Sequence, residues 1–408
     1  MKQWFNNRFV HNVGWIGLSE MMARVSRLLT AIVLARYLSL EEFGIAALVM
    51  TTDELIKVFN QNGIGAKIIH TSKQHLEAVC NTAYRLNWFV CITLFLLQSL
   101  AAFPIAWFYQ QPQLVEMVML LAIVYLLMPL GLVQAFLIQR ENRFKVIALV
   151  AGVQVTVDNL LTAGLAIAGF GVWAIVLPKL LVAPIWVIGM RMNYSWKFKL
   201  GTGFAHWQEI LHFGKHILGV ELLKTLRLNL DNLIIGRFLG IEALGIYYFA
   251  RNAGLGISLS LTRAFNTALF PHLCEVQHDR NLLREKFLNT LKIVSLSMIP
   301  LILAQALLAP WYVPIVFGEK WIVAIPVLVL LCLSAIPRPY GEGASEVMRV
   351  LNKPHIDFYW SLLFTVFFFI GLLAALPWGI TGVAVAILLI HLLALPAYTG
   401  WVIRKQLF

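Results

Sequence analysis

Charged residues are scarce in this sequence. Asp, Glu, Lys and Arg make up only 13% of the 408 residues, whereas hydrophobic residues make up 60%, and the mean hydropathy is +0.78. A soluble globular protein carries about 25% charged residues. The composition therefore argues against a soluble enzyme and indicates an integral membrane protein, whose apolar surplus faces lipid.

Paired cysteines and catalytic motifs are also lacking. The four cysteines are far apart, without a CxxC spacing or a neighbouring histidine, so neither a zinc site nor a disulfide framework is indicated. The sequence has no GxxxxGK[ST], HExxH or GxSxG motif and no Asp-rich loop. We expect no catalytic residues, no metal and no cofactor, and any energy that the protein uses must come from a gradient, the membrane potential or a partner.

The net charge of +12 would suggest nucleic-acid binding only if the basic residues clustered on a soluble face. They instead separate apolar runs, so we expect no nucleic-acid partner. Runs of about twenty mostly apolar residues predict membrane-spanning helices. Twelve are predicted, at 13–37, 43–66, 83–108, 114–138, 146–168, 171–192, 213–238, 243–270, 288–312, 321–341, 356–377 and 379–403.

The basic residues between these spans are distributed asymmetrically. Of the 32 Lys and Arg residues, only Arg36, Arg237 and Lys320 lie in connections on one face, and most of the others lie on the opposite face. Cytoplasmic loops of membrane proteins are enriched in Lys and Arg. The asymmetry therefore predicts a multi-pass protein with both termini in the cytoplasm.

The two halves share one pattern. The segment at 35–48, ARYLSLEEFGIAAL, aligns with the segment at 236–249, GRFLGIEALGIYYF. We expect an all-α membrane fold of about twelve helices in two homologous six-helix lobes, 1–192 and 213–408, joined by a cytoplasmic linker at 193–212. Parallel repeats of this kind place a substrate path between the lobes.

The repeated turn has a local explanation. Ser39 and Glu42 fit an S-x-x-E capping box, and Arg36 lies near the negative C-terminal end of the preceding helix. A structural role thus explains the motif, although a role for Arg36 or Arg237 at the outer mouth of a path stays open.

Ionisable residues inside the predicted spans are costly in a bilayer, at least about 2.5–3.5 kcal/mol each on insertion scales, and they mark function. In the first span, Glu20, Arg24 and Arg27 share one helical face. In the seventh span, its counterpart, the ionisable residues are Glu221, Lys224, Arg227 and Asp231. Elsewhere they are Asp53, Glu54, Lys57, Asp158, Lys179, Arg251 and Arg263.

These charges allow two interpretations. Some could be salt bridges that only hold helices together; the candidate pairs are Glu20–Arg24, Glu54–Lys57 and Arg227–Asp231. The number of charges exceeds what a helical bundle needs, so we favour a hydrated, mildly cationic lumen for an anionic cargo group. Arginine binds phosphate oxygens bidentately, which favours pyrophosphate as that group. The buried acids Glu20, Asp158, Glu221 and Asp231 could couple movement to protons.

An ordered series of segments resembles the polysaccharide transporter family, the oligosaccharide-lipid flippases of the multidrug/oligosaccharidyl-lipid/polysaccharide superfamily. The segments are RLLTAIVLARYLSLEEFGIAAL, NGIGAKII, GFGVWAIV, DNLIIGRFLGIEALGIYYFA, LFPHLCEVQHD, VFGEKWIVAIPVLVLL and GITGVAVA. The resemblance covers nearly the whole chain. It implies a two-lobe flippase of the bacterial inner membrane, not an enzyme, that moves an undecaprenyl-pyrophosphate-linked oligosaccharide for surface polysaccharide biosynthesis such as O-antigen or exopolysaccharide.

By this resemblance, the pyrophosphate and sugars would contact the cationic residues of the first, second, seventh and eighth spans while the polyprenyl tail stays in membrane lipid. These residues are Arg24, Arg27, Lys57, Lys224, Arg227 and Arg251. Contact with polysaccharide polymerase machinery is left open.

Three alternatives remain. A multidrug antiporter of the same superfamily shares the two-lobe plan, but its lumen should be acidic and aromatic. A twelve-span major facilitator also has two parallel halves. A membrane-embedded glycan transferase or ligase could also use buried charges, although the duplication and the lack of a large external loop count against it.

Overall fold

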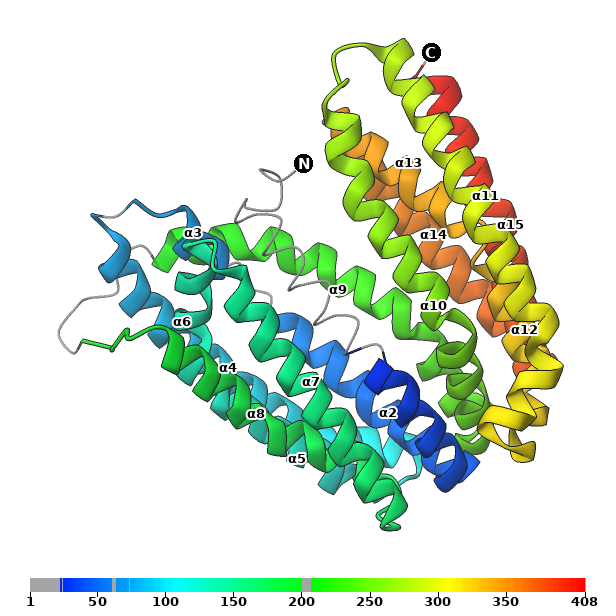
Figure 1. Cartoon of the computed structure of the whole chain (residues 1–408), viewed down its shortest axis with the longest axis horizontal. Helices are drawn as coiled ribbons and strands as arrows, with labels where there is room; N and C mark the ends of the chain where they lie inside the picture. The colour runs from blue at the N-terminus through cyan, green and yellow to red at the C-terminus, as the bar shows by residue number, and fades with distance from the viewer. Residues whose placement is uncertain (1–22, 24, 61–63, 73, 200–206, 408) are drawn as a thin grey trace, which may run out of the picture. The chain divides into compact units, whose positions relative to one another are not determined.

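The computed structural model describes residues 23, 25–60, 64–72, 74–199 and 207–407, and within these ranges the chain is helical and contains no strand. The chain divides into two compact units, Met1–Leu228 and Asn229–Phe408, called here the N-terminal unit and the C-terminal unit. Figure 1 shows the course of the chain through both units. The predicted linker at 193–212 divides two duplicated lobes, which are defined by sequence similarity and not by compactness, and it stays a prediction.

The N-terminal unit is built from long helices joined by short turns. Residues 25–37 are helical. The helices that follow are α2 (Leu40–Lys57), the 3-10 turn η1 (Val58–Asn60), α3 (Ile64–His70), α4 (Leu76–Tyr109), α5 (Leu114–Leu127), α6 (Pro129–Arg140), α7 (Phe144–Ile167) and α8 (Trp173–Asn193). Helix α9 (Trp207–Phe238) begins in this unit and ends in the next one.

Helix pairs of the N-terminal unit pack closely, and some of their buried polar groups form hydrogen bonds from one helix to the next. α4 packs against α5, α7 against α8, and α5 against α8. The buried Gln98 side chain on α4 donates from Nε2 to the carbonyl of Val118 on α5 at 2.9 Å. Such bonds between helices supply partners that lipid cannot offer.

The capping box predicted from S-x-x-E is confirmed. The Glu42 backbone N–H donates to Ser39 Oγ at 3.1 Å, and the Ser39 backbone N–H donates to Glu42 Oε2 at 2.7 Å. α2 therefore begins at Leu40 because its first orphan donors are satisfied reciprocally. The same glutamate touches the loop before α8, since a Cβ atom added at Gly171, where φ is +54°, would overlap Glu42 Oε1.

Helices α5 and α6 form one bent segment. They meet at Met128 and are inclined by 54° to each other, with Pro129 as the first residue of α6. Proline fixes φ and lacks an N–H, so it suits the first turn of a helix and interrupts the one before it. The bend lies beside the polar residues of α2 described below.

The C-terminal unit contains the end of α9 and the remaining helices. They are α10 (Ile241–Cys274), α11 (Arg280–Tyr312), the π-helical turn η2 (Val313–Phe317), the 3-10 segment η3 (Glu319–Ala324), α12 (Ile325–Ser334), α13 (Arg338–Val350), α14 (Pro354–Ala375), the 3-10 turn η4 (Leu376–Trp378) and α15 (Gly379–Gln406). α15 packs against α12, α13 and α14, and α10 packs against α12 and α13.

Six helical stretches among the described residues are long and apolar enough to cross a membrane, and the bent α5–α6 pair makes a seventh. One of the six, Pro354–Gln406, contains both α14 and α15. α2 fails the same test because five charged residues lie along its 18 residues. The predicted count of twelve spans therefore stays a prediction, whereas the all-helical membrane architecture is confirmed.

Candidate functional site

A cavity of about 320 Å³ lies in the N-terminal unit, among α2, α5, α7 and α8, and is called here the polar cavity because four charged residues interrupt its otherwise mostly apolar lining. Its charged lining consists of Asp53 and Lys57 from α2, Asp158 from α7 and Lys179 from α8. The spacing i, i+4 puts Asp53 and Lys57 on one face of their helix. The cavity therefore gathers two carboxylates and two ammonium groups within one bundle of mostly apolar helices.

Two of these groups form an ion pair across neighbouring helices. Lys179 Nζ donates to Asp158 Oδ2. The other carboxylate oxygen, Asp158 Oδ1, is buried and has no hydrogen-bond partner within the described part of the chain. A buried acceptor without a hydrogen bond is costly, so this oxygen marks a position where a proton, a water or a ligand hydroxyl could bind.

The other carboxylate of the cavity lies beside a tyrosine. Tyr125 on α5 donates from its hydroxyl to Asp53 Oδ1 across 3.5 Å, which is a long and weak hydrogen bond. Tyr125 is two residues before the end of α5 and three before Met128, where the α5–α6 segment bends. The bend and the polar cavity are thus adjoining features of the same unit.

A second cluster lies in the C-terminal unit, between the end of α9 and α10. Asp231 Oδ2 accepts from the hydroxyl of Tyr247 at 2.5 Å, and Oδ1 accepts from Arg251 Nη1 at 3.1 Å. Asp231 and Tyr247 are buried. Arg338, at the start of α13, interacts electrostatically with the same three residues. This cluster is an enclosed ion pair with a hydrogen-bonded carboxylate.

The structure brings several predicted site residues together. Lys57 and Asp158 line one cavity, and Arg251 pairs with Asp231. Glu221 and Lys224 lie one turn apart on α9 with 3.9 Å between Oε1 and Nζ.

The other predicted site residues are more dispersed. Arg27 is exposed in the helical stretch 25–37, and Arg227 is half-buried on α9. Arg24 and Glu20 lie outside the described residues.

Sequence reasoning did not place Asp53, Tyr125 or Lys179, which supply polar side chains to the cavity, among the predicted site residues. Asp53 and Lys179 carry a signal in the sequence, because each is an ionisable residue in an apolar helix, and Lys179 follows Asp158 on the next helix. Tyr125 carries no such signal in the sequence, because nothing sets a tyrosine apart in the apolar run LVEMVMLLAIVYLL. Only the structure shows that it contacts Asp53 on α2. The cavity balances two basic against two acidic groups, so its lining is less cationic than the lumen that was predicted.

Solved structures with the same fold include two kinds of transporter. The chain matches the lipid II flippase MurJ in its inward closed conformation with a TM-score of 0.79 and 12% identity, covering 96% of this chain and 87% of MurJ. It also matches an inward-facing multidrug resistance transporter of the MATE family with a TM-score of 0.73 and 14% identity, covering 94% of each chain. At these identities the likeness shows the fold and leaves the substrate undecided.

Relatives in sequence include proteins named for teichuronic acid and succinoglycan biosynthesis. The chain is 27% identical over 374 residues to the teichuronic acid biosynthesis protein TuaB of Bacillus subtilis, covering 90% of this chain and 76% of TuaB. It is 24% identical over 364 residues to the succinoglycan biosynthesis transport protein ExoT of Rhizobium meliloti, covering 86% of this chain and 71% of ExoT. The model of the family described as polysaccharide biosynthesis protein matches residues 33–326. The chain is therefore a multi-pass membrane protein that belongs to the polysaccharide biosynthesis protein family.

Proposed function

We propose that this protein is a flippase that moves undecaprenyl-pyrophosphate-linked oligosaccharide units across the bacterial inner membrane for surface polysaccharide biosynthesis. The observation that carries the proposal is the polar cavity among α2, α5, α7 and α8 in a unit otherwise made of apolar helices. Family membership supports the proposal, as does the transport role in the name of ExoT. A polar interior without a catalytic motif suits a carrier better than an enzyme.

The chemistry of the cavity suits a cargo with phosphates and sugars. The ammonium groups of Lys57 and Lys179 offer donors to anionic oxygens, and the free Oδ1 of Asp158 offers an acceptor to a sugar hydroxyl. Together these groups can bind both the phosphate part and the sugar part of such a headgroup. The residues proposed for cargo contact are Arg24, Arg27, Lys57, Lys224, Arg227 and Arg251.

The mechanism proposed is alternating access, in which two six-helix lobes, 1–192 and 213–408, rock about a cargo site near mid-membrane. Among the four acids proposed for ion coupling (Glu20, Asp158, Glu221 and Asp231), Asp158 has the most direct support. Its Oδ1 atom is an unpaired acceptor, so a proton can bind there without breaking the Lys179 contact.

The topology proposed places both termini and the 193–212 linker in the cytoplasm. The support is the asymmetric distribution of Lys and Arg residues between the two faces, because cytoplasmic loops are enriched in these residues. The cargo is proposed to move from the cytoplasmic leaflet to the outer leaflet, and contact with polysaccharide polymerase machinery stays open.

A multidrug antiporter is the main competing function, because a transporter of that kind has the same fold. Family membership disfavours it, because the matching family model is described as polysaccharide biosynthesis protein. A membrane-embedded glycan transferase is a further alternative, and it would form a new covalent bond where a flippase forms none.

The experiment that tests the proposal measures lipid-linked oligosaccharides extracted from cells with and without this protein, by mass spectrometry. A flippase defect should lead to accumulation of complete undecaprenyl-pyrophosphate repeat units together with loss of surface polysaccharide. An unchanged pool with increased drug sensitivity would instead establish the antiporter. Accumulation of incomplete units would point to a transferase.

A further inference from the structure

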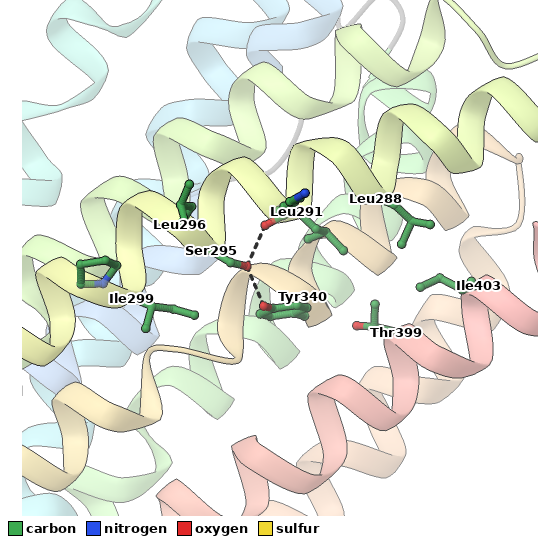
Figure 2. Close-up of a pocket in the computed structure, with 10 residues that line it drawn as sticks. Leu288, Leu291, Ser295, Leu296, Ile299, Tyr340, Thr399 and Ile403 are labelled. Carbon is green, nitrogen blue, oxygen red and sulfur yellow. Dashed lines mark hydrogen bonds between the residues drawn. The ribbon is translucent and has the colours of Figure 1, made fainter.

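A long apolar groove lies in the C-terminal unit between α11, α13 and α15, and its volume is about 530 Å³ (Figure 2). Leu288, Leu291, Leu296 and Ile299 of α11 form one wall, and Ile403 of α15 lies opposite. Leu296 is 77% exposed. The groove is therefore open along its length and belongs to one unit only.

The dimensions of the groove match one leaflet of a bilayer. Its α11 wall runs from Leu288 to Pro300, which at 1.5 Å per residue is roughly 18 Å along the helix axis. The hydrocarbon core of a bilayer is about 30 Å thick, so each leaflet contributes about 15 Å. A ligand that lies along this wall would therefore be about as long as one leaflet is thick.

The polar groups of the groove floor are already bonded to each other. Ser295 Oγ lies 2.7 Å from the carbonyl of Leu291 and 2.6 Å from the hydroxyl of Tyr340 (Figure 2). These contacts use the hydroxyl protons and leave an inner surface made chiefly of leucine and isoleucine side chains. The groove thus suits a hydrocarbon chain rather than a sugar or another polar solute.

Positive charge is concentrated towards one end of the groove. Lys292 lines it, is exposed and has no ion-pair partner among the described residues. The start of α11 adjoins the end of α15, because Arg280 donates to the Gln406 carbonyl. Arg404 and Lys405, which are exposed, directly follow Ile403 at this end.

We propose that this groove is a binding site for an anionic phospholipid, with an acyl chain along α11 and the lipid phosphate on the Lys292 ammonium. A phospholipid matches both features of the groove, because its acyl chain would lie on the apolar wall from Lys292 to Pro300, roughly 12 Å along the helix axis, and its anionic phosphate would lie beside Lys292. A zwitterionic lipid would bring a cationic headgroup to the same basic end, so the site prefers anionic lipid. This inference does not depend on the cargo of the transporter.

The test compares the full chain with its Lys292→Gln variant, each reconstituted in nanodiscs of phosphatidylethanolamine with a minor fraction of phosphatidylglycerol. Native mass spectrometry then counts the phosphatidylglycerol molecules retained on each protein. One lysine near an anionic surface contributes about 1 kcal/mol, so the variant should retain phosphatidylglycerol about fivefold more weakly. Lys197→Gln removes another exposed lysine, from the N-terminal unit, and should change nothing.

A second variant separates a groove from a merely basic surface. Ile299→Trp fills the apolar part of the groove and leaves Lys292 in place, and it should also weaken phosphatidylglycerol retention. If Lys292→Gln has no effect, or if Ile299→Trp retains as much lipid as the unmodified chain, the inference is wrong. A thermal unfolding curve for each variant, matched to that of the unmodified chain, excludes loss of folding as the cause.

Discussion

The carboxylate of Asp231 and the guanidinium of Arg251 lie 3.1 Å apart, on consecutive helices, in a buried cluster that also includes Tyr247. Sequence reasoning gave these two residues different tasks, ion coupling for the acid and cargo binding for the base. Their contact means that neither charge can change without affecting the other. A role of Arg251 in transport must therefore be separated experimentally from its role in neutralising Asp231.

Arg251→Ala should destabilise the protein by about 3–5 kcal/mol, because it removes the cation that is hydrogen-bonded to a buried carboxylate. The double variant Arg251→Ala with Asp231→Asn should recover most of that stability. Thermal unfolding in detergent measures both. Arg349→Ala removes an exposed partner of Glu346 and should cost less than about 1 kcal/mol. A stable double variant that still transports would show that Arg251 serves structure alone.

Asp158→Asn should abolish any stimulation of transport by a pH gradient while keeping the fold, because asparagine retains the shape of the side chain but cannot bind a proton at Oδ1. Flipping of a lipid-linked oligosaccharide in proteoliposomes, with and without an imposed gradient, measures the effect. Glu116→Gln, which neutralises an exposed acid on α5, is the matched control. Persistent gradient dependence in Asp158→Asn would assign coupling to another acid.

Lys57→Ala should lower the rate of flipping about 10-fold to 100-fold, because a charge-assisted hydrogen bond to an anionic cargo is worth about 1.5–3 kcal/mol. Membrane insertion should be normal, since Lys57 is exposed to the cavity. The comparison is with Lys197→Ala, an exposed lysine after α8, which should transport at the unmodified rate. Equal flipping rates for both variants would show that the cargo does not pass through this cavity.

Gly171→Ala and Gly164→Ala should have opposite effects on stability. Alanine at 171 is forced into a positive φ and its Cβ overlaps Glu42, so the capping box of α2 is disturbed and about 1–2 kcal/mol is lost. At 164, inside α7, a Cβ meets no neighbour, and alanine should gain up to about 1 kcal/mol. Parallel unfolding curves measure the pair, and a stable Gly171→Ala would contradict the described contact.

The sequence was sufficient to predict the helical membrane architecture and some local features. Apolar runs predicted helices that the structure contains, and S-x-x-E predicted the start of α2. Both signals depend on neighbours in the chain, so they can be read without knowing the tertiary structure. Family membership likewise followed from an ordered series of segments.

The composition of the cavity could not be predicted, because it depends on how each helix is rotated about its axis. In a soluble helix the apolar face points to the core. Here lipid and core are both apolar, and α5, for example, is nearly uniform around its circumference. Asp53, Tyr125 and Lys179 therefore became recognisable as neighbours only once the helices were placed side by side.

The ion pairs also bear on how the chain enters the bilayer during synthesis. Asp158 and Lys179 lie on the consecutive helices α7 and α8, and Asp231 and Arg251 lie on α9 and α10. Each acid thus meets its base within a single hairpin, before any distant segment has been made. A nascent hairpin can neutralise its own charges as it leaves the translocon, so neither ion pair has to wait for helices that are made later.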